Sequence, residues 1–323
     1  MTRSLGEEMT TQLDLFLHAP RHYHLAIERL SALDLRGCEV ALAEHRRLFP
    51  FGSDPGPVEE AARWLAEHLP GEDAEIPLYG RQALEACRVL VGGCAPAAFS
   101  RVGPETARRA AGSLASRCLR KMAAAEVEPS TPLTGDLPWA VFHLWAGDPW
   151  AARRGLETFV RGREESPLAY LALGDALWQA GRPEESLRAY REGYGLDPDG
   201  EGWVPASPRM AEIRGPLAAE PFFAGEWWAV GAYLDARFPS YRGATPEVVG
   251  KRWERFLRFL GEMPESGAAP HPRRGQPPLF FAGLVLSENA RWVGLRDLEF
   301  VRKTLRELNP QAYEIHLERL DEE

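Results

Sequence analysis

The sequence lacks long hydrophobic runs and is poor in cysteine. Its longest apolar run, residues 279–286, is far shorter than the roughly 18 to 20 residues that cross a bilayer. The four cysteines among 323 residues show none of the paired spacings of a metal site or a disulfide-rich scaffold. The N-terminal residues are polar and acidic and lack the apolar core of a secretory signal. We therefore expect a cytoplasmic protein with no membrane segment and no metal ion.

The local motifs that announce catalysis are also missing. There is no glycine-rich phosphate loop ending in Gly-Lys-Ser/Thr, no Gly-x-Ser-x-Gly elbow, no His-Glu-x-x-His helix and no Cys-x-x-Cys pair. On this basis we predict no catalytic residue and no cofactor. Because catalytic side chains often come from distant positions in a chain, an enzyme stays open as an alternative.

The sequence also has no excess of positively charged residues. The formal net charge is −9 at pH 7, which argues against a surface built throughout to bind nucleic acid. Hydrophobic residues make up 45% of the chain and charged residues 26%. This composition is typical of a globular protein and excludes a chain that is disordered throughout or fibrous.

Residues 167–200, PLAYLALGDALWQAGRPEESLRAYREGYGLDPDG, carry the clearest pattern in the chain. Apolar and small residues recur there at helical spacing in two runs, which predicts two helices. Gly181-Arg182-Pro183 lies between the runs. Glycine can take the left-handed conformation that ends a helix, and proline fits the first turn of the next one. Pro198 then closes the unit, so the stretch predicts a helical hairpin.

This hairpin resembles the tetratricopeptide repeat, a 34-residue helix–turn–helix unit. The residues that match the family's pattern are Tyr170, Leu173, Gly174, Leu177, Ser186, Tyr190, Gly193 and Pro198. Residues 133–166 echo the pattern with an offset of 34, most clearly where residues 146–149, Ala-Gly-Asp-Pro, precede residues 180–183, Ala-Gly-Arg-Pro. The echo is imperfect, because Ala140 stands in place of Gly174 and Pro138 can shorten the first helix.

The whole chain predicts an all-α fold, a helical-hairpin array or TPR-like α-solenoid with irregular flanking helices. The expected domains are an N-terminal helical region at 1–130, two repeats within 131–200 (133–166 and 167–200), and a C-terminal helical region at 201–323 with a Pro/Gly-rich loop at 263–278. About three repeats are needed for a stack to stand alone, so the flanking helices must cap the pair. Outside the repeats, the apolar periodicity predicts a helical hairpin at 13–49 and helices near 57–69, 79–91, 104–126, 221–238, 246–262, 279–293, 295–308 and 310–320.

The resemblance implies a scaffold that binds a protein or peptide ligand. In that family the first helix of each repeat lines an inner groove, which corresponds here to Leu168, Leu171, Asp175, Trp178 and Gln179, with Trp145 from the weaker repeat. We predict that Trp145 and Trp178 dominate binding, because an exposed tryptophan offers a large contact area at little entropic cost. Burial of both under neighbouring helices is the alternative. Leucine and aspartate stand where the family's carboxylate-gripping groups stand, so a hydrophobic or basic ligand is expected. The oligomeric state cannot be derived from the sequence.

The helix expected at 104–126 carries the basic stripe of the chain. At 100° per residue, Arg109, Arg117, Arg120 and Lys121 fall on roughly one side. Such a face suits an acidic peptide or a nucleic-acid backbone. No aromatic side chain is interleaved for base stacking, however, which argues against nucleic acid. A solvated face is the simpler interpretation.

A function of another class is an all-helical enzyme or effector-neutralising protein with a pocket between the N-terminal and C-terminal helical regions. The tryptophan-rich C-terminal half and the linker at 263–278 motivate it, as pocket wall and lid. Trp227 and Trp228 cannot both point the same way on a helix. We expect one of them in the core and the other as a surface anchor.

Overall fold

The computed structural model describes residues 21–50, 54–92, 97–218, 220, 223–262 and 276–322. Over these residues the chain consists of helices and connections without strands, with one isolated β-bridge between Pro132 and Pro138. The all-α prediction is therefore confirmed for the described part of the chain. No helix there is both long enough and apolar enough to span a bilayer.

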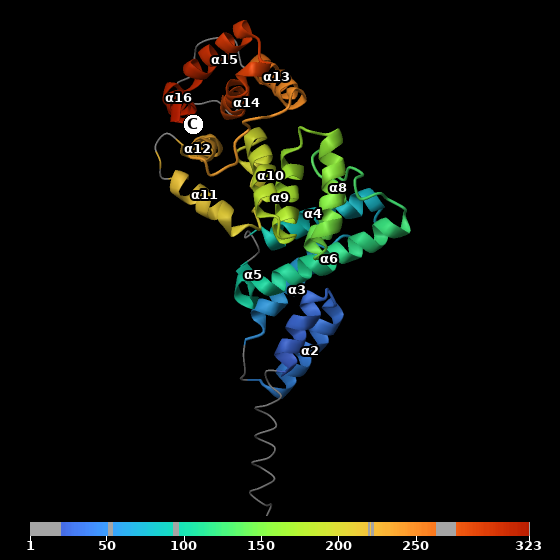
Figure 1. Ribbon diagram of the computed structural model, residues 1–323. Helices are drawn as coiled ribbons and strands as arrows, with labels where there is room; N and C mark the ends of the chain where they lie inside the picture. The colour runs from blue at the N-terminus through green and yellow to red at the C-terminus, as the bar shows by residue number, and fades with distance from the viewer. Residues whose placement is uncertain are drawn as a thin grey trace, which may run out of the picture. The chain divides into compact units, whose positions relative to one another are not determined.

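The chain divides into two compact units, Met1–Gly155 and Leu156–Glu323 (Figure 1). In unit 1, helical residues 21–31 precede α2. The elements that follow are α2 (Leu35–Leu48), α3 (Gly56–His68), α4 (Ile76–Val91), α5 (Ala97–Val102), α6 (Pro104–Ala124), α7 (Val141–Trp145) and the first half of α8 (Pro149–Gly162).

The core of unit 1 lies where α4 packs on α6 and α3 packs on α5. The buried face of α6 consists largely of alanine, with Leu114 and Cys118 among the small side chains. Small residues let two helices approach closely, and Cys87 of α4 accordingly donates to the carbonyl of Ala111 at 3.5 Å. Burial raises the pKa of Cys118 to about 12, so this thiol is packed as an inert, protonated side chain.

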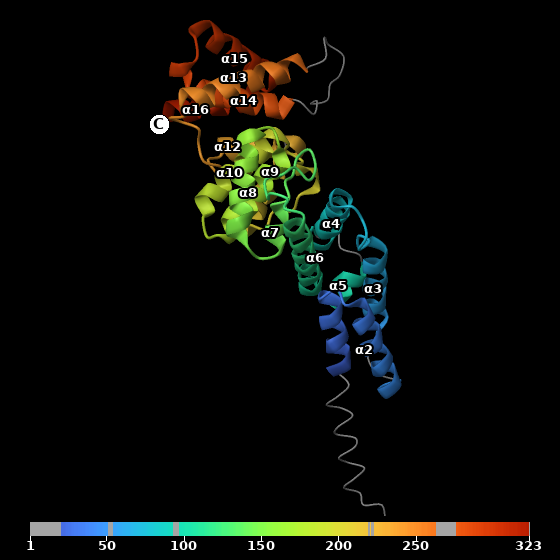
Figure 2. The same cartoon turned by 90° about the vertical axis from the view of Figure 1, so that its right-hand side faces the viewer.

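Unit 2 contains the rest of α8 and all later helices. These elements are α9 (Pro167–Gln179), α10 (Pro183–Leu196), η1 (Gly200–Gly202), α11 (Pro208–Ala218), η2 (Gly225–Trp227), α12 (Trp228–Leu234), α13 (Pro246–Gly261), α14 (Gln276–Glu288), η3 (Ala290–Trp292), α15 (Leu295–Leu308) and α16 (Pro310–Glu322). The antiparallel pair α9–α10 contacts α12 and α14 through α10. Figure 2 shows α13, α14, α15 and α16 gathered at one end of this unit, where successive helices pack on one another.

The hairpin α9–α10 forms where the sequence predicted it. Gly181 has a φ of +74°, the left-handed conformation that ends α9, and Pro183 opens α10. The helices cross closely at Gly174, where an added Cβ would lie 2.7 Å from the ring of Tyr190. The Ser186 hydroxyl donates to the Gly174 carbonyl across this contact, at 2.7 Å.

The turn before α8 has the same backbone form as the turn before α10. Gly147 has a φ of +84°, and Asp148 N donates to the His143 carbonyl at 2.9 Å, as Arg182 N does to the Leu177 carbonyl at 2.9 Å. The helix before the first turn is much shorter, because α7 spans only Val141–Trp145. Residues 131–140 are turns and bends that include the bridge between Pro132 and Pro138, so the helix of this unit begins only after Pro138.

Two expectations for the region after the hairpin were wrong. Over the described residues 223–238 of the helix expected at 221–238, helical structure is limited to η2 and α12, and both tryptophans at their junction are buried. The change from 3-10 to α-helix there alters the angle between consecutive residues. Trp227 packs against Phe280 with ring centroids 5.3 Å apart, and Trp228 donates to the Pro198 carbonyl at 3.0 Å. Neither is a surface anchor.

Candidate functional site

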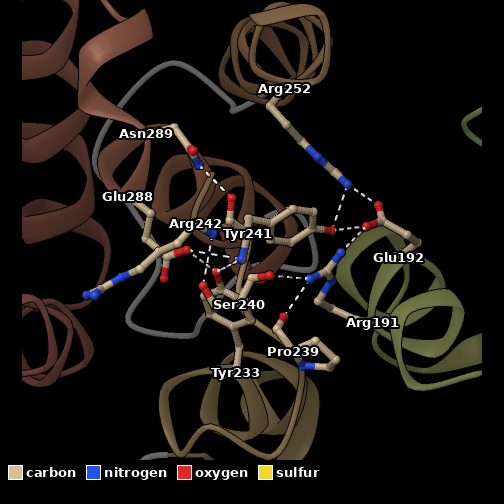
Figure 3. Close-up of polar contacts among 10 residues, drawn as sticks. All are labelled: Arg191, Glu192, Tyr233, Pro239, Ser240, Tyr241, Arg242, Arg252, Glu288 and Asn289. Atoms are coloured by element: carbon tan, nitrogen blue, oxygen red, sulfur yellow. Dashed lines mark hydrogen bonds and ion pairs between the residues drawn. The ribbon is translucent and has the colours of Figure 1, made fainter. Parts of the chain in front are cut away.

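Charged side chains occupy interior positions in unit 2. On α10, Arg191 and Glu192 follow the buried Tyr190, and on α13 Arg252 and Arg255 lie one turn apart. Arg191, Arg252 and Arg255 are only 7%, 6% and 7% exposed. Arginine is rarely buried to this extent unless its charge is paired. These four residues, with the segment 239–242 between α12 and α13, form the arginine cluster; Figure 3 shows all of its members except Arg255.

Glu192 is the carboxylate at the centre of the arginine cluster. It accepts a hydrogen bond from Arg191 at 3.0 Å and further bonds from Arg252 and the Tyr241 hydroxyl. Burial alone would raise the pKa of Glu192, but Arg252 and Arg191 lower it to about 2. Glu192 is therefore ionised at neutral pH and stays a hydrogen-bond acceptor, which excludes it as a general acid there.

Tyr241 joins the two sides of the cluster. The guanidinium groups of Arg191 and Arg252 lie 3.3 Å and 4.9 Å from its ring centroid, within the range of cation–π attraction. On the other side of the ring in Figure 3, its backbone N–H donates to the Tyr233 hydroxyl at 3.0 Å. That hydroxyl in turn donates to Glu288. The connection between α12 and α13 is thus fixed by side chains from several helices.

Backbone carbonyls complete the fixation of this connection. Arg191 donates to the carbonyls of Pro239 and Ser240, and Asn289 donates to that of Tyr241 at 3.1 Å. Asn289 also accepts from Ala244 N at 3.1 Å. Chemically, the cluster offers positively charged donors and one neutralising carboxylate, which suits binding of an anion rather than nucleophilic chemistry.

The residues predicted to line a binding groove are not all at the surface. Leu171 is fully buried and Asp175 is 4% exposed, so neither side chain is available to a partner. Trp178 is half-buried and Gln179 is exposed, both in unit 2, while Trp145 is half-buried in unit 1. Participation of these last three in binding stays a prediction.

The reason for the burial of Asp175 is the segment that follows the hairpin. Trp203 Nε1 donates to its carboxylate at 3.0 Å, Ala206 N does so at 2.7 Å, and the Tyr190 hydroxyl donates as well. The sequence interpretation assigned Asp175 to an external ligand. The structure corrects it, because the chain's own residues 203–206 bind this carboxylate.

The predicted basic face is partly a pocket. A surface pocket of about 440 Å³ lies beside α6 and is lined by Arg117, Arg120 and Lys121. The other lining residues are Leu69, Pro70, Glu72, Asp73, Tyr79 and Leu114. Lys121 donates to the Glu72 carbonyl at 2.6 Å and lies 4.6 Å from the Tyr79 ring centroid.

Two arginines of the predicted basic face, Arg117 and Arg109, make contacts with other residues of unit 1. Arg117 donates to the Leu33 carbonyl at 3.0 Å. Arg109 pairs with Glu105 at 3.1 Å and does not line the pocket. The interpretation of this face as merely solvated is therefore wrong for Arg117 and Lys121, because both side chains bind backbone carbonyls of other parts of unit 1.

Sequence reasoning missed the arginine cluster altogether. A signal was present, since Arg191 stands at helical spacing between the buried Leu187 and Tyr194. Charges at apolar positions of a helix indicate either a satisfied network or a ligand. Within the described ranges, no group of three or more His, Cys, Asp or Glu side chains is placed to hold a metal ion. The predicted lid at 263–278 falls mainly on residues 263–275, outside the described residues.

Positive charge is thus concentrated in two regions of the described residues, a surface pocket in unit 1 and a buried cluster in unit 2. Comparison with protein-family models, with curated proteins and with solved structures finds no match to this sequence or fold.

Proposed function

We propose that the chain is a helical binding protein, with α9–α10 as a TPR-like hairpin and an acidic peptide segment of another protein as its ligand. The hairpin's close crossing at Gly174 and the Ser186 bond across it support the resemblance, because that family depends on small residues where its two helices cross. The similar left-handed turns at Gly147 and Gly181, 34 residues apart, support it further.

The ligand site that we propose is not the inner face of α9. That helix is buried along most of its length, and residues 203–206 cover Asp175. A partner at this position would have to displace the chain's own hydrogen bonds. A surface that is already open is the better binding site.

The observation that carries the proposal is the pocket beside α6. Arg117, Arg120 and Lys121 project from adjacent turns of one rigid helix into a pocket of about 440 Å³, a volume suited to a few side chains. Arg120 is exposed and has no hydrogen-bond or ion-pair partner in the part of the chain described. Its guanidinium is free to pair with a carboxylate of the ligand.

Two carboxylates modify the preference of the pocket for an acidic ligand. Glu72 and Asp73 line the same pocket from the exposed loop before α4. The lining therefore carries three positive and two negative side chains. An acidic segment meets the cations on α6 while a neighbouring basic residue of the ligand meets the loop.

Fluorescence anisotropy with a labelled oligo-glutamate peptide tests the proposal. Arg120→Glu should weaken binding by about tenfold or more, since it replaces an attraction by a repulsion. Arg108→Glu is the matched control, because Arg108 is exposed on the same helix but does not line the pocket. Replacing Glu72 and Asp73 together by Gln and Asn should tighten binding. Equal effects of the two arginine variants, or equal binding of oligo-lysine, would overturn the assignment.

A further inference from the structure

Arg255 in the arginine cluster has an unusual set of hydrogen bonds. Its Nη2 donates to the Glu164 carbonyl at 3.0 Å. Its Nε and Nη1 are buried and have no hydrogen-bond partner among the described residues. A buried charged donor without an acceptor from the protein is strongly unfavourable, and such groups are satisfied by water or by an ion. The guanidinium thus marks a place where an acceptor is required.

The charge of the cluster points to the sign of that acceptor. Its side chains on α10 and α13 are Arg191, Arg252 and Arg255, with three positive charges, and Glu192, with one negative charge, which leaves an excess of two positive charges between these two helices. The carboxylate of Glu164 does not reduce this excess, because Lys251 binds it at 2.6 Å. Burial and the neighbouring Arg252 lower the pKa of Arg255, as expected for an arginine whose charge is not fully compensated.

Tyr170 of α9 adds a donor at the edge of the cluster. The charges of Glu192, Arg255 and Arg252 all act on the pKa of its hydroxyl. Burial raises the pKa of Tyr170 to about 12. A tyrosine hydroxyl is protonated at neutral pH and can donate a hydrogen bond. Tyr170 and Glu164 are only half-buried, which places this side of the cluster near solvent.

We propose that Arg255, Arg252 and Tyr170 bind an oxyanion of the phosphate type. A phosphate group carries about 1.5 to 2 negative charges at neutral pH. Its unprotonated oxygens are hydrogen-bond acceptors, which suits the excess positive charge and the unpartnered donors of Arg255. A neutral ligand would leave the charge uncompensated. The site lies in unit 2 and is independent of the peptide pocket in unit 1.

Thermal unfolding of the full chain in sodium phosphate and in sodium chloride at matched ionic strength tests the site. Phosphate at low millimolar concentration should raise the midpoint temperature in a saturable manner, because it binds the folded state. The general stabilisation by excluded phosphate does not saturate, so only the saturable response reports the site. Arg255→Gln should abolish this response, and Arg255→Lys should weaken phosphate binding by about tenfold or more, since lysine lacks the planar fork. Arg258→Gln is the control on the same helix, because Arg258 pairs with Glu165 and Glu262 outside the cluster.

A second arm of the experiment uses glycerol phosphate to distinguish two sources of the same group. A response to both compounds upholds a site for free phosphate, and a response to glycerol phosphate alone upholds a site for a phosphoryl group on a larger molecule. Equal midpoints in all salts, or a phosphate response that survives in Arg255→Gln, would overturn the proposal. If Arg255→Gln does not fold, the Lys variant and Tyr170→Phe decide, and an unchanged response in both would count against it.

Discussion

Trp203 donates a hydrogen bond of 3.0 Å to Asp175, the residue to which the repeat pattern assigned an external ligand. The bond joins residues 28 positions apart and is buried. It means that the segment after the hairpin satisfies the one carboxylate on α9. The carboxylate of Asp175 is internal to unit 2, so its protonation affects the stability of the fold and not the binding of a ligand.

Asp175 should make the folded chain less stable as the pH rises through the slightly acidic range. Burial raises the pKa of Asp175 from 3.8 to about 7, against the opposing effect of its three donors. Between these values the folded state binds more protons than the unfolded state, so stability falls as the pH increases. Asp175→Asn does not titrate. The free energy of unfolding of the wild type, relative to this variant, should therefore decrease from about pH 4 to about pH 7 in urea titrations.

The comparison with Asp175→Asn cancels all titrations that both proteins share. A difference in stability that stays constant across this range would show that Asp175 is ionised throughout. The three hydrogen bonds would then outweigh the burial of the charge.

His316 should act in the opposite sense. It is fully buried on α16, and neither ring nitrogen has a hydrogen-bond partner among the described residues. Burial lowers the pKa of His316 to about 4, with a contribution from nearby arginines. Between about pH 6.5 and pH 4 the imidazole of His316 is protonated in the unfolded chain but not in the folded chain, so the stability of the fold decreases as the pH falls. His316→Leu should remove this part of the acid sensitivity, as measured by thermal melts across the range. A variant that loses as much stability as the wild type would exclude His316 as the cause.

The crossing of α9 and α10 should not tolerate a side chain at Gly174. An added Cβ would lie 2.7 Å from the Tyr190 ring, and overpacking of this kind costs about 1–3 kcal/mol. Gly174→Ala should lower the free energy of unfolding in urea by that amount. Gly250→Ala on α13 is the control, because nothing lies within 4 Å of its added Cβ. Alanine there should stabilise by up to about 1 kcal/mol through helix propensity. The same loss in both variants would contradict the close crossing.

Helices whose starts carry a proline were the most predictable part of the fold. Pro104, Pro183, Pro246 and Pro310 each open a helix where the sequence placed one, because proline fits the first turn and fits poorly later. The same rule argued against a helix at α11, because Pro216 lies inside that helix next to Gly215. Local signals favoured a break there, and tertiary packing of the buried Met210, Ile213 and Leu217 outweighed them.

The site residues were harder to predict, because burial depends on what covers a helix and not on the helix itself. Asp175 has the spacing of a groove residue, and only the later Trp203 turns that position into an interior one. The basic stripe could be read from one helix, but its pocket requires the loop at Glu72 and Asp73. Glu192 and Arg252 are brought together by the fold across 60 residues, a relationship that no local pattern contains.

The hairpin and the arginine cluster also differ in the length of chain that each must close. The Ser186 bond to Gly174 spans 12 residues, whereas Arg191 reaches Pro239 across 48. Short loops close at a lower entropic cost, and local contacts form sooner. In pulsed hydrogen exchange during refolding, the amides of α9 and α10 should gain protection before those of α13. The three arginines would then stay hydrated until the last stage of assembly, so a mutation among them should mainly speed unfolding, while a mutation at the hairpin crossing should slow folding.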